Sequence, residues 1–312
     1  MRAFLKLVEI QTKIASVTPF IWSIIFTGYY FGSLRLDLLL IFFASMLAFD
    51  MFTTALNNYL DKRAKKRHGY NYEEHNAIVR YGMSEKKVLL IIAVLFIAAA
   101  AFGLLLFSRT DAIVLLLGAA CFITGILYSA GPVPISRTPL GEIFSGFIMG
   151  YLLPFIVIYF SISAQKPVIL VLNAEYISIL INWKALIPIT LALIPTTLLI
   201  AGIMLANNIC DIEDDIANKR YTLPIYIGKK PALVIFNLLC ILCYLDILVG
   251  IILGYLPALS LITLVPAIRV FRNLREFGKV QTKKDTFKYA VDNLILVMAP
   301  LSLSVLMAWL LR

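Results

Sequence analysis

The stretch Ala206–Gly228 reads ANNICDIEDDIANKRYTLPIYIG and follows an apolar run that begins near Ala185. Asn207, Asp211 and Asp215 are spaced four residues apart, so on a helix their side chains share one face. Carboxylates crowded together repel one another unless a cation compensates, and oxygen ligands of this kind suit Mg²⁺ with phosphate oxygens and water. We therefore expect a metal–phosphate site here. Its expected metal ligands are Asn207, Asp211 and Asp215, and its expected phosphate ligands are Lys219 and Arg220.

The composition of the chain places this site in a membrane protein. Of its 312 residues 61% are hydrophobic and 15% are charged, and the mean hydropathy is +0.90. These values exclude a soluble globular domain, and apolar runs of about 20 residues, long enough to cross a bilayer as helices, recur along the chain. We predict an all-α bundle of nine transmembrane helices around a central cavity. The expected spans are 14–33, 38–59, 88–107, 111–130, 140–163, 185–208, 232–254, 256–271 and 290–311.

The distribution of basic residues predicts how these spans are oriented. Of the 28 Lys and Arg residues, 23 fall on one side of the predicted spans and five on the other. The positive-inside rule then predicts a cytoplasmic N-terminus, an external C-terminus and the acidic stretch at the cytoplasmic face. Topology and contact with anionic lipid account for the net charge of +10, so we expect no nucleic-acid partner. The external segment 164–184 is apolar but interrupted, and we expect a re-entrant or surface segment there.

A second polar cluster occurs earlier in the chain. Asn57-Asn58-x-x-Asp61 repeats the pattern Asn207-Asn208-x-x-Asp211 150 positions earlier, and both copies close an even-numbered predicted span. An internal duplication would place the two clusters across a shared cavity, which is a recurring plan in membrane proteins. We therefore add Asn57 and Asp61 to the expected metal ligands. Asp61, Asp211 and Asp215 are the expected catalytic carboxylates.

Further polar residues lie near the same predicted face. Lys13 enters the membrane with the first span and either faces an anion inside the bundle or serves as an interfacial anchor. Arg80 stands apart from the basic run of its loop and is a candidate phosphate ligand. Tyr128 precedes a proline-rich turn and either orients the substrate or belongs to an aromatic belt. Asp50, an acid within the second span, either lines the cavity or is a satisfied structural group.

Acidic clusters, flanking cations and an apolar membrane chamber together favour a substrate with a diphosphate head and an apolar tail. Mg²⁺ bound to the diphosphate neutralises the charge that builds on the leaving group, and Arg and Lys on the free oxygens add to this stabilisation. Loss of diphosphate from an allylic tail leaves a delocalised carbocation, which an apolar chamber protects from water. An electron-rich acceptor then attacks carbon.

These motifs make the chain resemble the UbiA superfamily of membrane prenyltransferases over essentially its whole length, 1–312, as a single domain. The second motif, NNICDIEDDIANKRYTL, looks most like that of the 1,4-dihydroxy-2-naphthoate polyprenyltransferases of menaquinone synthesis, with Tyr221 inserted before Thr222. The turn YSAGPVP followed by LGE is also similar to theirs. The resemblance implies Mg²⁺-dependent transfer from polyprenyl diphosphate to dihydroxynaphthoate, with loss of CO₂, to give demethylmenaquinone. The alternatives are another aromatic acceptor such as 4-hydroxybenzoate, or a transporter or lipid-binding protein on the same fold.

The first motif departs from the family pattern at its last position. The family's final aspartate is Lys65 here, so one carboxylate of that cluster is replaced by a cation. Three interpretations are open at this point. Asp61 with Asn57 holds the metal alone, Glu73 or Glu74 supplies a substitute carboxylate, or Lys65 binds the diphosphate directly.

Overall fold

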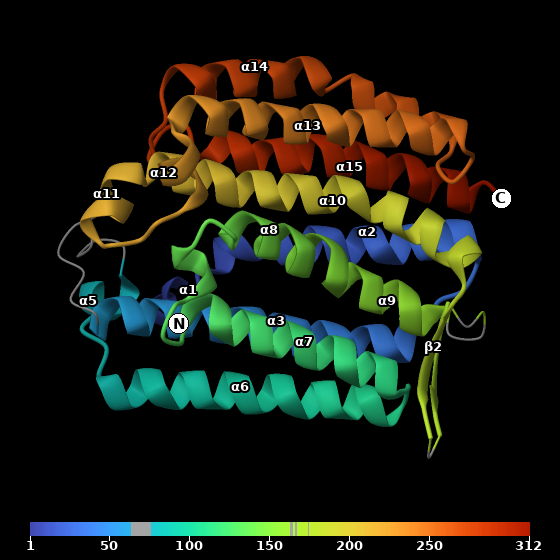
Figure 1. Ribbon diagram of the computed structural model, residues 1–312, viewed down its shortest axis with the longest axis horizontal. Helices are drawn as coiled ribbons and strands as arrows, with labels where there is room; N and C mark the ends of the chain where they lie inside the picture. Colours follow the sequence, from blue (N-terminus) through green and yellow to red (C-terminus); the bar gives the residue numbers. More distant parts are fainter. Residues whose placement is uncertain (64–75, 163–164, 166, 174) are drawn as a thin grey trace.

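The computed structural model describes residues 1–63, 76–162, 165, 167–173 and 175–312. Eight helices in this described part are long and apolar enough to cross a membrane. The protein is therefore a mostly helical, multi-pass membrane bundle, as predicted (Figure 1). The spans are η1–α2 (Ile10–Phe31), α3 (Leu36–Arg63), α6 (Glu85–Ser108), α7 (Ala112–Ser129), α8–η3–α9 (Gly141–Ser145, Gly146–Leu152, Leu153–Ser161), α10 (Trp183–Cys210), α13 (Lys229–Ile252) and α15 (Lys288–Leu310). Short helices lie at the chain's loops: α1 (Arg2–Leu7), α5 (Ala77–Arg80), η2 (Ile135–Arg137), α11 (Ile212–Ala217) and α12 (Leu223–Ile227).

The predicted eighth span, 256–271, does not form one apolar helix. Its residues are divided between η5 (Ala258–Leu264) and the beginning of α14 (Ala267–Lys279), with Pro257 and Pro266 directly before the two helical segments. Proline lacks a backbone N–H and so interrupts the helical hydrogen bonds, and the two prolines lie where the two segments begin. The two together run beside α13 along the bundle in Figure 1.

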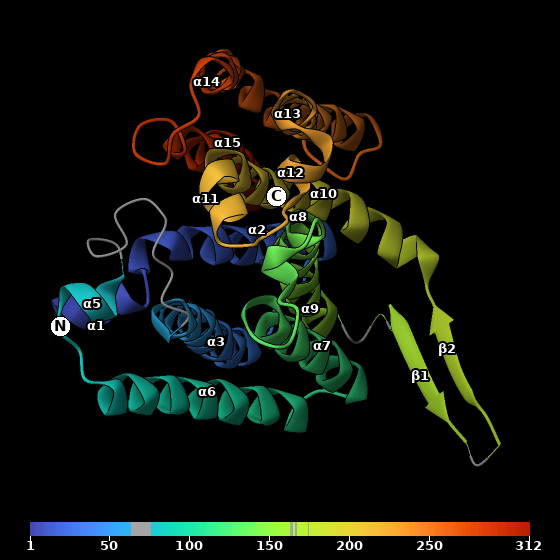
Figure 2. The same cartoon turned by 60° about the vertical axis from the view of Figure 1, so that its left-hand side comes forward.

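The segment 164–184 contains a β-hairpin, which the all-α prediction missed. Strands β1 (Val168–Leu172) and β2 (Ile177–Ile181) pair antiparallel, with Val168 opposite Ile181. Their Ile, Val and Leu residues favour extended structure, and Asn173 and Glu175 lie in the connection. The hairpin projects from the helices at one end of the bundle (Figure 2), so the expectation of a surface segment is met by strands.

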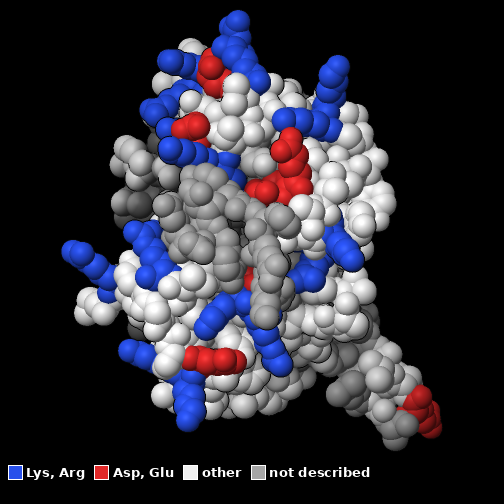
Figure 3. Space-filling view, turned by 90° about the vertical axis from the view of Figure 1, so that its left-hand side faces the viewer, with Lys and Arg blue, Asp and Glu red and all other residues white. Residues whose placement is uncertain are grey.

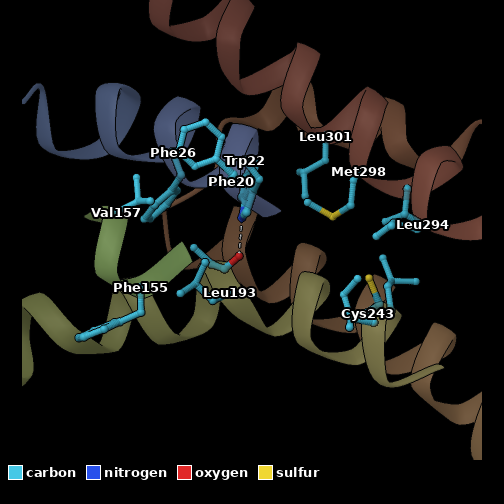
Figure 4. Packing of buried hydrophobic residues seen from close by; sticks show 14 of the residues in the cluster. Phe20, Trp22, Phe26, Phe155, Val157, Leu193, Cys243, Leu294, Met298 and Leu301 are labelled. Carbon is cyan, nitrogen blue, oxygen red and sulfur yellow. Dashed lines mark hydrogen bonds between the residues drawn. The ribbon is translucent and has the colours of Figure 1, made fainter. Parts of the chain in front are cut away.

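The centre of the bundle is held by contacts between helices far apart in the sequence. Trp22 on α2 is fully buried, and its indole Nε1 donates a hydrogen bond of 2.7 Å to the backbone carbonyl of Ala192 on α10 (Figure 4). One turn further along α10, Gly150 of η3 lies so close that a Cβ atom there would come within 2.5 Å of the Cα of Thr197. The hydroxyl of Thr196 donates to the Gly150 carbonyl at 2.6 Å. These contacts hold α10 against both α2 and η3.

The loops that carry the two aspartate motifs lie at one end of the molecule. Helices α3, α7 and α10 end there, and α8, α13 and α15 begin there, whereas the hairpin and the C-terminus lie at the opposite end (Figure 1). Lys and Arg side chains are spread over the first of these ends, with one group of acidic side chains near its centre and others among the basic ones (Figure 3). Both aspartate motifs therefore reach the same end of the bundle.

Candidate functional site

A cavity of about 810 Å³ opens between the helices and carries the polar residues of both motifs. Its walls are mainly apolar, with Phe42, Met46, Phe49, Ile148 and Met149 among the side chains that line it. Its polar lining includes Asn57, Asp61, Asn207, Asp211, Arg220 and Lys283. The cavity thus joins a polar mouth to an apolar interior.

The two motifs face the same cavity from different helices. Asn57 and Asp61 come from the last turns of α3, whereas Asn207 lies in the last turn of α10 and Asp211 directly follows it. The arrangement that we expected, two polar clusters on one cavity, is what the structure builds. The internal duplication itself stays a prediction.

The second asparagine of each motif is structural. Asn58 is buried, and its side-chain amide donates to Glu9 Oε1 at 3.2 Å and to the Leu7 carbonyl at 3.1 Å. Asn208 is 1% exposed, and its amide donates to Glu142 Oε1 at 2.8 Å. In both cases the partner glutamate lies where another membrane span begins. The motif alone did not separate the residue that faces the cavity from the one that joins two helices.

Asp211 has an ion-pair partner that the sequence did not indicate. Its Oδ2 lies 2.6 Å from Lys283 Nζ and 3.5 Å from the amide nitrogen of Asn207. Lys283 belongs to the connection between α14 and α15, 72 residues further along the chain, and is one of seven basic residues between Arg269 and Lys288. The pairing depends on tertiary structure, since no local pattern joins the two residues.

Asp215 is buried, and its side chain contacts residues that follow it in the sequence. Its side chain is an ion pair with Arg220, Oδ1 to Nε 3.2 Å, and accepts a hydrogen bond from the Thr222 hydroxyl at 3.2 Å. Burial raises the pKa of this carboxyl, and the positive charge of Arg220 opposes that effect. Arg220 in turn donates to the Ser136 carbonyl at 3.1 Å and lines the cavity, which Asp215 does not. The proline-rich turn and the second motif are therefore joined through Arg220.

Lys13 is buried against an acid of the protein itself. Its Nζ lies 2.6 Å from Asp50 Oδ1 and donates to the Thr54 hydroxyl at 2.7 Å. Ser16 donates to the other oxygen of Asp50 at 2.6 Å. Asp50 lines the cavity and is also satisfied by the protein, so both of the roles considered for it apply. The anion that Lys13 meets inside the bundle is this carboxylate.

The remaining candidates are spread over the same end of the protein. Tyr128 lines the cavity, and its hydroxyl donates to the Gly141 carbonyl at 3.5 Å. Arg80, on α5, and Lys219, after α11, have exposed side chains and are not part of the cavity lining. Lys65, Glu73 and Glu74 lie outside the described residues, so the three interpretations of the altered first motif stay open.

The donor set fits Mg²⁺ held jointly by protein and substrate. Within the described part of the chain no three His, Cys, Asp or Glu side chains cluster closely enough to form an all-protein metal centre. The cavity instead offers one carboxylate and one amide from each motif, all with oxygen donors. Mg²⁺ is commonly bound through one or two carboxylates together with substrate phosphates and water. The lining residues match that mode of binding.

Comparison with known proteins gives relatives of the same architecture. The family model described as "UbiA prenyltransferase family" matches residues 16–310. A 1,4-dihydroxy-2-naphthoate octaprenyltransferase of Bacillus subtilis is 33% identical over 225 residues, which are 71% of this chain and 65%, slightly under two thirds, of that relative.

Solved structures agree in fold at low sequence identity. A UbiA homolog from Archaeoglobus fulgidus bound to GPP and Mg²⁺ has a TM-score of 0.65 at 14% identity, covering 98% of this chain and 99% of that one. The apo UbiA homolog from Aeropyrum pernix K1 has a TM-score of 0.66 at 16% identity, covering 93% and 96%. The resemblance that the motifs predicted is confirmed: this chain belongs to the UbiA prenyltransferase family of membrane proteins.

Proposed function

We propose that this protein transfers a polyprenyl group from polyprenyl diphosphate to an aromatic ring carbon, with 1,4-dihydroxy-2-naphthoate as the acceptor. The observation that carries the proposal is that both aspartate motifs contribute polar side chains to one cavity whose walls are mainly apolar. The Bacillus subtilis relative, named for this acceptor, supports the choice of dihydroxynaphthoate. In menaquinone synthesis the product would be the quinol form of demethylmenaquinone.

The polar mouth would hold the diphosphate. Asn57, Asp61, Asn207 and Asp211 would bind Mg²⁺, which when bound supplies positive charge to the diphosphate oxygens. Arg220 lines the same mouth and would contact those oxygens with its guanidinium group. In our proposal the role of Asp215 is to hold Arg220 in this position through their ion pair. The bond from the diphosphate oxygen to the prenyl carbon then breaks, and its electron pair leaves with the diphosphate.

The apolar chamber would hold the prenyl chain and the ring. Phe42, Met46, Phe49 and Met149 line it and exclude water from the allylic cation. The ring hydroxyls of the acceptor supply electron density, and a ring carbon forms the new bond to the prenyl carbon. Loss of the acceptor's carboxylate as CO₂ returns an electron pair to the ring and restores its aromaticity. Tyr128 lies at the mouth and would orient the substrate.

The other predicted residues have supporting places in the proposal. Lys13 would hold the cavity wall through Asp50, whereas Arg80 and Lys219 would attract the diphosphate from the exposed rim. The concentration of basic side chains around the mouth supports a cytoplasmic active site with the N-terminus inside and the C-terminus outside (Figure 3).

The test is an assay of the purified protein in lipid nanodiscs with a prenyl diphosphate, Mg²⁺ and a mixture of aromatic acceptors. We expect mass spectrometry to find the prenylated, decarboxylated naphthoquinol. A product from 4-hydroxybenzoate alone would correct the acceptor but keep the reaction. Release of no diphosphate with any acceptor would contradict the enzymatic proposal in favour of a binding or transport protein.

A further inference from the structure

We propose that Lys283, from the loop between α14 and α15, is a diphosphate ligand that shares Asp211 with the bound metal. The inference rests on the proposed function, because it assumes that the polar mouth receives a diphosphate. It assigns the last loop of the protein, which neither aspartate motif includes, a direct role in substrate binding.

The position of Lys283 is the first support. Its Nζ lies 2.6 Å from Asp211 Oδ2, and both residues line the cavity. The Lys283 side chain is 30% exposed and that of Asp211 is 14% exposed, so the pair stands at the mouth rather than in the core. An ammonium group has three N–H donors, and a single carboxylate leaves donors for phosphate oxygens.

The balance of charge in the cavity is the second support. Among the described residues that line it, the acids are Glu9, Asp50, Asp61 and Asp211, and the cations are Arg220 and Lys283. Arg220 is already bound to Asp215 and to the Ser136 carbonyl, so its guanidinium is partly occupied by the protein. A diphosphate brought into this mouth needs a further cation, and Lys283 is the one that lies beside a motif carboxylate.

The loop that carries Lys283 is anchored rather than loose. Thr282 N donates to Thr286 Oγ1 at 2.9 Å, and Asp285 N donates to Thr282 Oγ1 at 3.2 Å, so the residues on both sides of Lys283 form a closed turn. Gln281 donates to the carbonyl of Phe277, a fully buried residue of α14 that packs against Phe236. These hydrogen bonds therefore fix the backbone of the turn that places Lys283 beside Asp211.

Sharing one carboxylate has a measurable consequence. The ammonium group and the metal both seek the oxygens of Asp211, so a fixed positive charge at Lys283 opposes metal binding while it favours diphosphate binding. Removing the charge should weaken diphosphate binding without weakening metal binding. A lysine that only orients Asp211 would lower both affinities together when it is replaced.

The experiment compares Lys283→Gln with wild type in nanodiscs, using two binding measurements that need no turnover. One is titration with Mn²⁺ alone, followed by the electron paramagnetic resonance of free Mn²⁺. The other is calorimetric titration with inorganic diphosphate at saturating Mg²⁺. Lys284→Gln is the matched control, since Lys284 is the adjacent residue, is exposed and does not line the cavity. Lys283→Arg tests rescue by a retained charge.

We expect Lys283→Gln to bind diphosphate about tenfold more weakly or worse, as the loss of a charge-assisted hydrogen bond implies, and to bind Mn²⁺ no more weakly than wild type. Lys284→Gln should match wild type, and Lys283→Arg should recover much of the diphosphate affinity. Unchanged diphosphate binding by Lys283→Gln would overturn the inference, and so would a parallel loss of Mn²⁺ and diphosphate affinity. Wild type that binds no diphosphate with Mg²⁺ would instead contradict the proposed function.

Discussion

The side-chain amide of Asn208 donates a 2.8 Å hydrogen bond to Glu142 Oε1, which ties the end of α10 to the beginning of α8. Both residues are buried, at 1% and 4% exposure. Asn58 and Glu9 make the corresponding contact between the end of α3 and the chain before α2, at 3.2 Å. In each half of the protein, a polar clamp therefore lies directly beside the asparagine that faces the cavity.

Removing this clamp should lower stability. Asn208→Leu leaves the buried carboxylate of Glu142 without its amide donor, and an unsatisfied buried group of this kind costs about 1–3 kcal/mol. We expect a lower midpoint of thermal unfolding in detergent, measured by tryptophan fluorescence. Asn218→Leu, in the loop beyond α11, is the comparison variant and should have a smaller effect. Equal midpoints for Asn208→Leu and wild type would show that the hydrogen bond contributes no stability.

Replacing a motif carboxylate should lower the rate of prenyl transfer far more than it lowers stability. Asp211→Asn removes a charge from the proposed metal site while keeping the shape of the side chain, and metal stabilisation of a leaving group is worth several kcal/mol. We expect the rate of prenyl transfer to fall at least about a hundredfold with only a small drop in the unfolding midpoint, because the amide oxygen of asparagine can still accept a hydrogen bond from Lys283. Glu213→Gln is the control, because Glu213 is exposed two residues away. Full activity of Asp211→Asn would remove this residue from the metal ligands.

The ion pair between Lys13 and Asp50 should matter far more than one at the surface. Their side chains are 5% and 17% exposed, and breaking a buried pair by removing one partner costs about 3–5 kcal/mol. Asp50→Leu should therefore destabilise the protein, and the double variant Lys13→Met, Asp50→Leu should recover much of the loss.

Arg35 and Asp37 provide the matched surface pair, with side chains 48% and 47% exposed. Asp37→Leu should leave the unfolding midpoint almost unchanged, since solvent-exposed ion pairs contribute little. Chemical unfolding followed by circular dichroism measures all three variants. A loss for Asp37→Leu as large as that for Asp50→Leu would contradict the distinction between the two pairs.

The length of the accepted prenyl chain should depend on free volume at Gly118. This residue lines the cavity, and a Cβ atom added to it would have no neighbouring atom within 4 Å. Gly118→Phe places a ring in the apolar chamber, so we expect longer prenyl diphosphates to lose activity before shorter ones. Product mass spectrometry with donors of increasing length measures this shift.

Gly278→Phe is the control, because Gly278 also has open space around it but lies on α14, away from the cavity lining. Its donor preference should equal that of wild type. An equal loss of activity for short and long donors in Gly118→Phe would mean that the ring disturbs packing rather than chain length.

The sequence by itself determined the membrane class, the helical bundle and the two motifs. Apolar runs of span length leave a chain no stable alternative in lipid, where backbone groups must be hydrogen-bonded within each helix, so eight spans were readable from composition. The predicted span at 256–271 forms two helical segments rather than one, with Pro257 and Pro266 directly before them, because proline interrupts the helical hydrogen bonds while it hardly changes the mean hydropathy. The hairpin at 168–181 was missed because short apolar runs are compatible with either strand or helix.

Only the tertiary structure decided which side chains work together at the site. Local spacing placed Asn207 and Asp211 on one helix face, but it held no information about Lys283, which reaches Asp211 from a loop 72 residues away. Lys13 and Asp50 likewise looked like independent candidates until the first two spans packed together. The physical reason is that helix formation depends on neighbouring residues, whereas ion pairing depends on the distance between charges, which is set only when the helices pack.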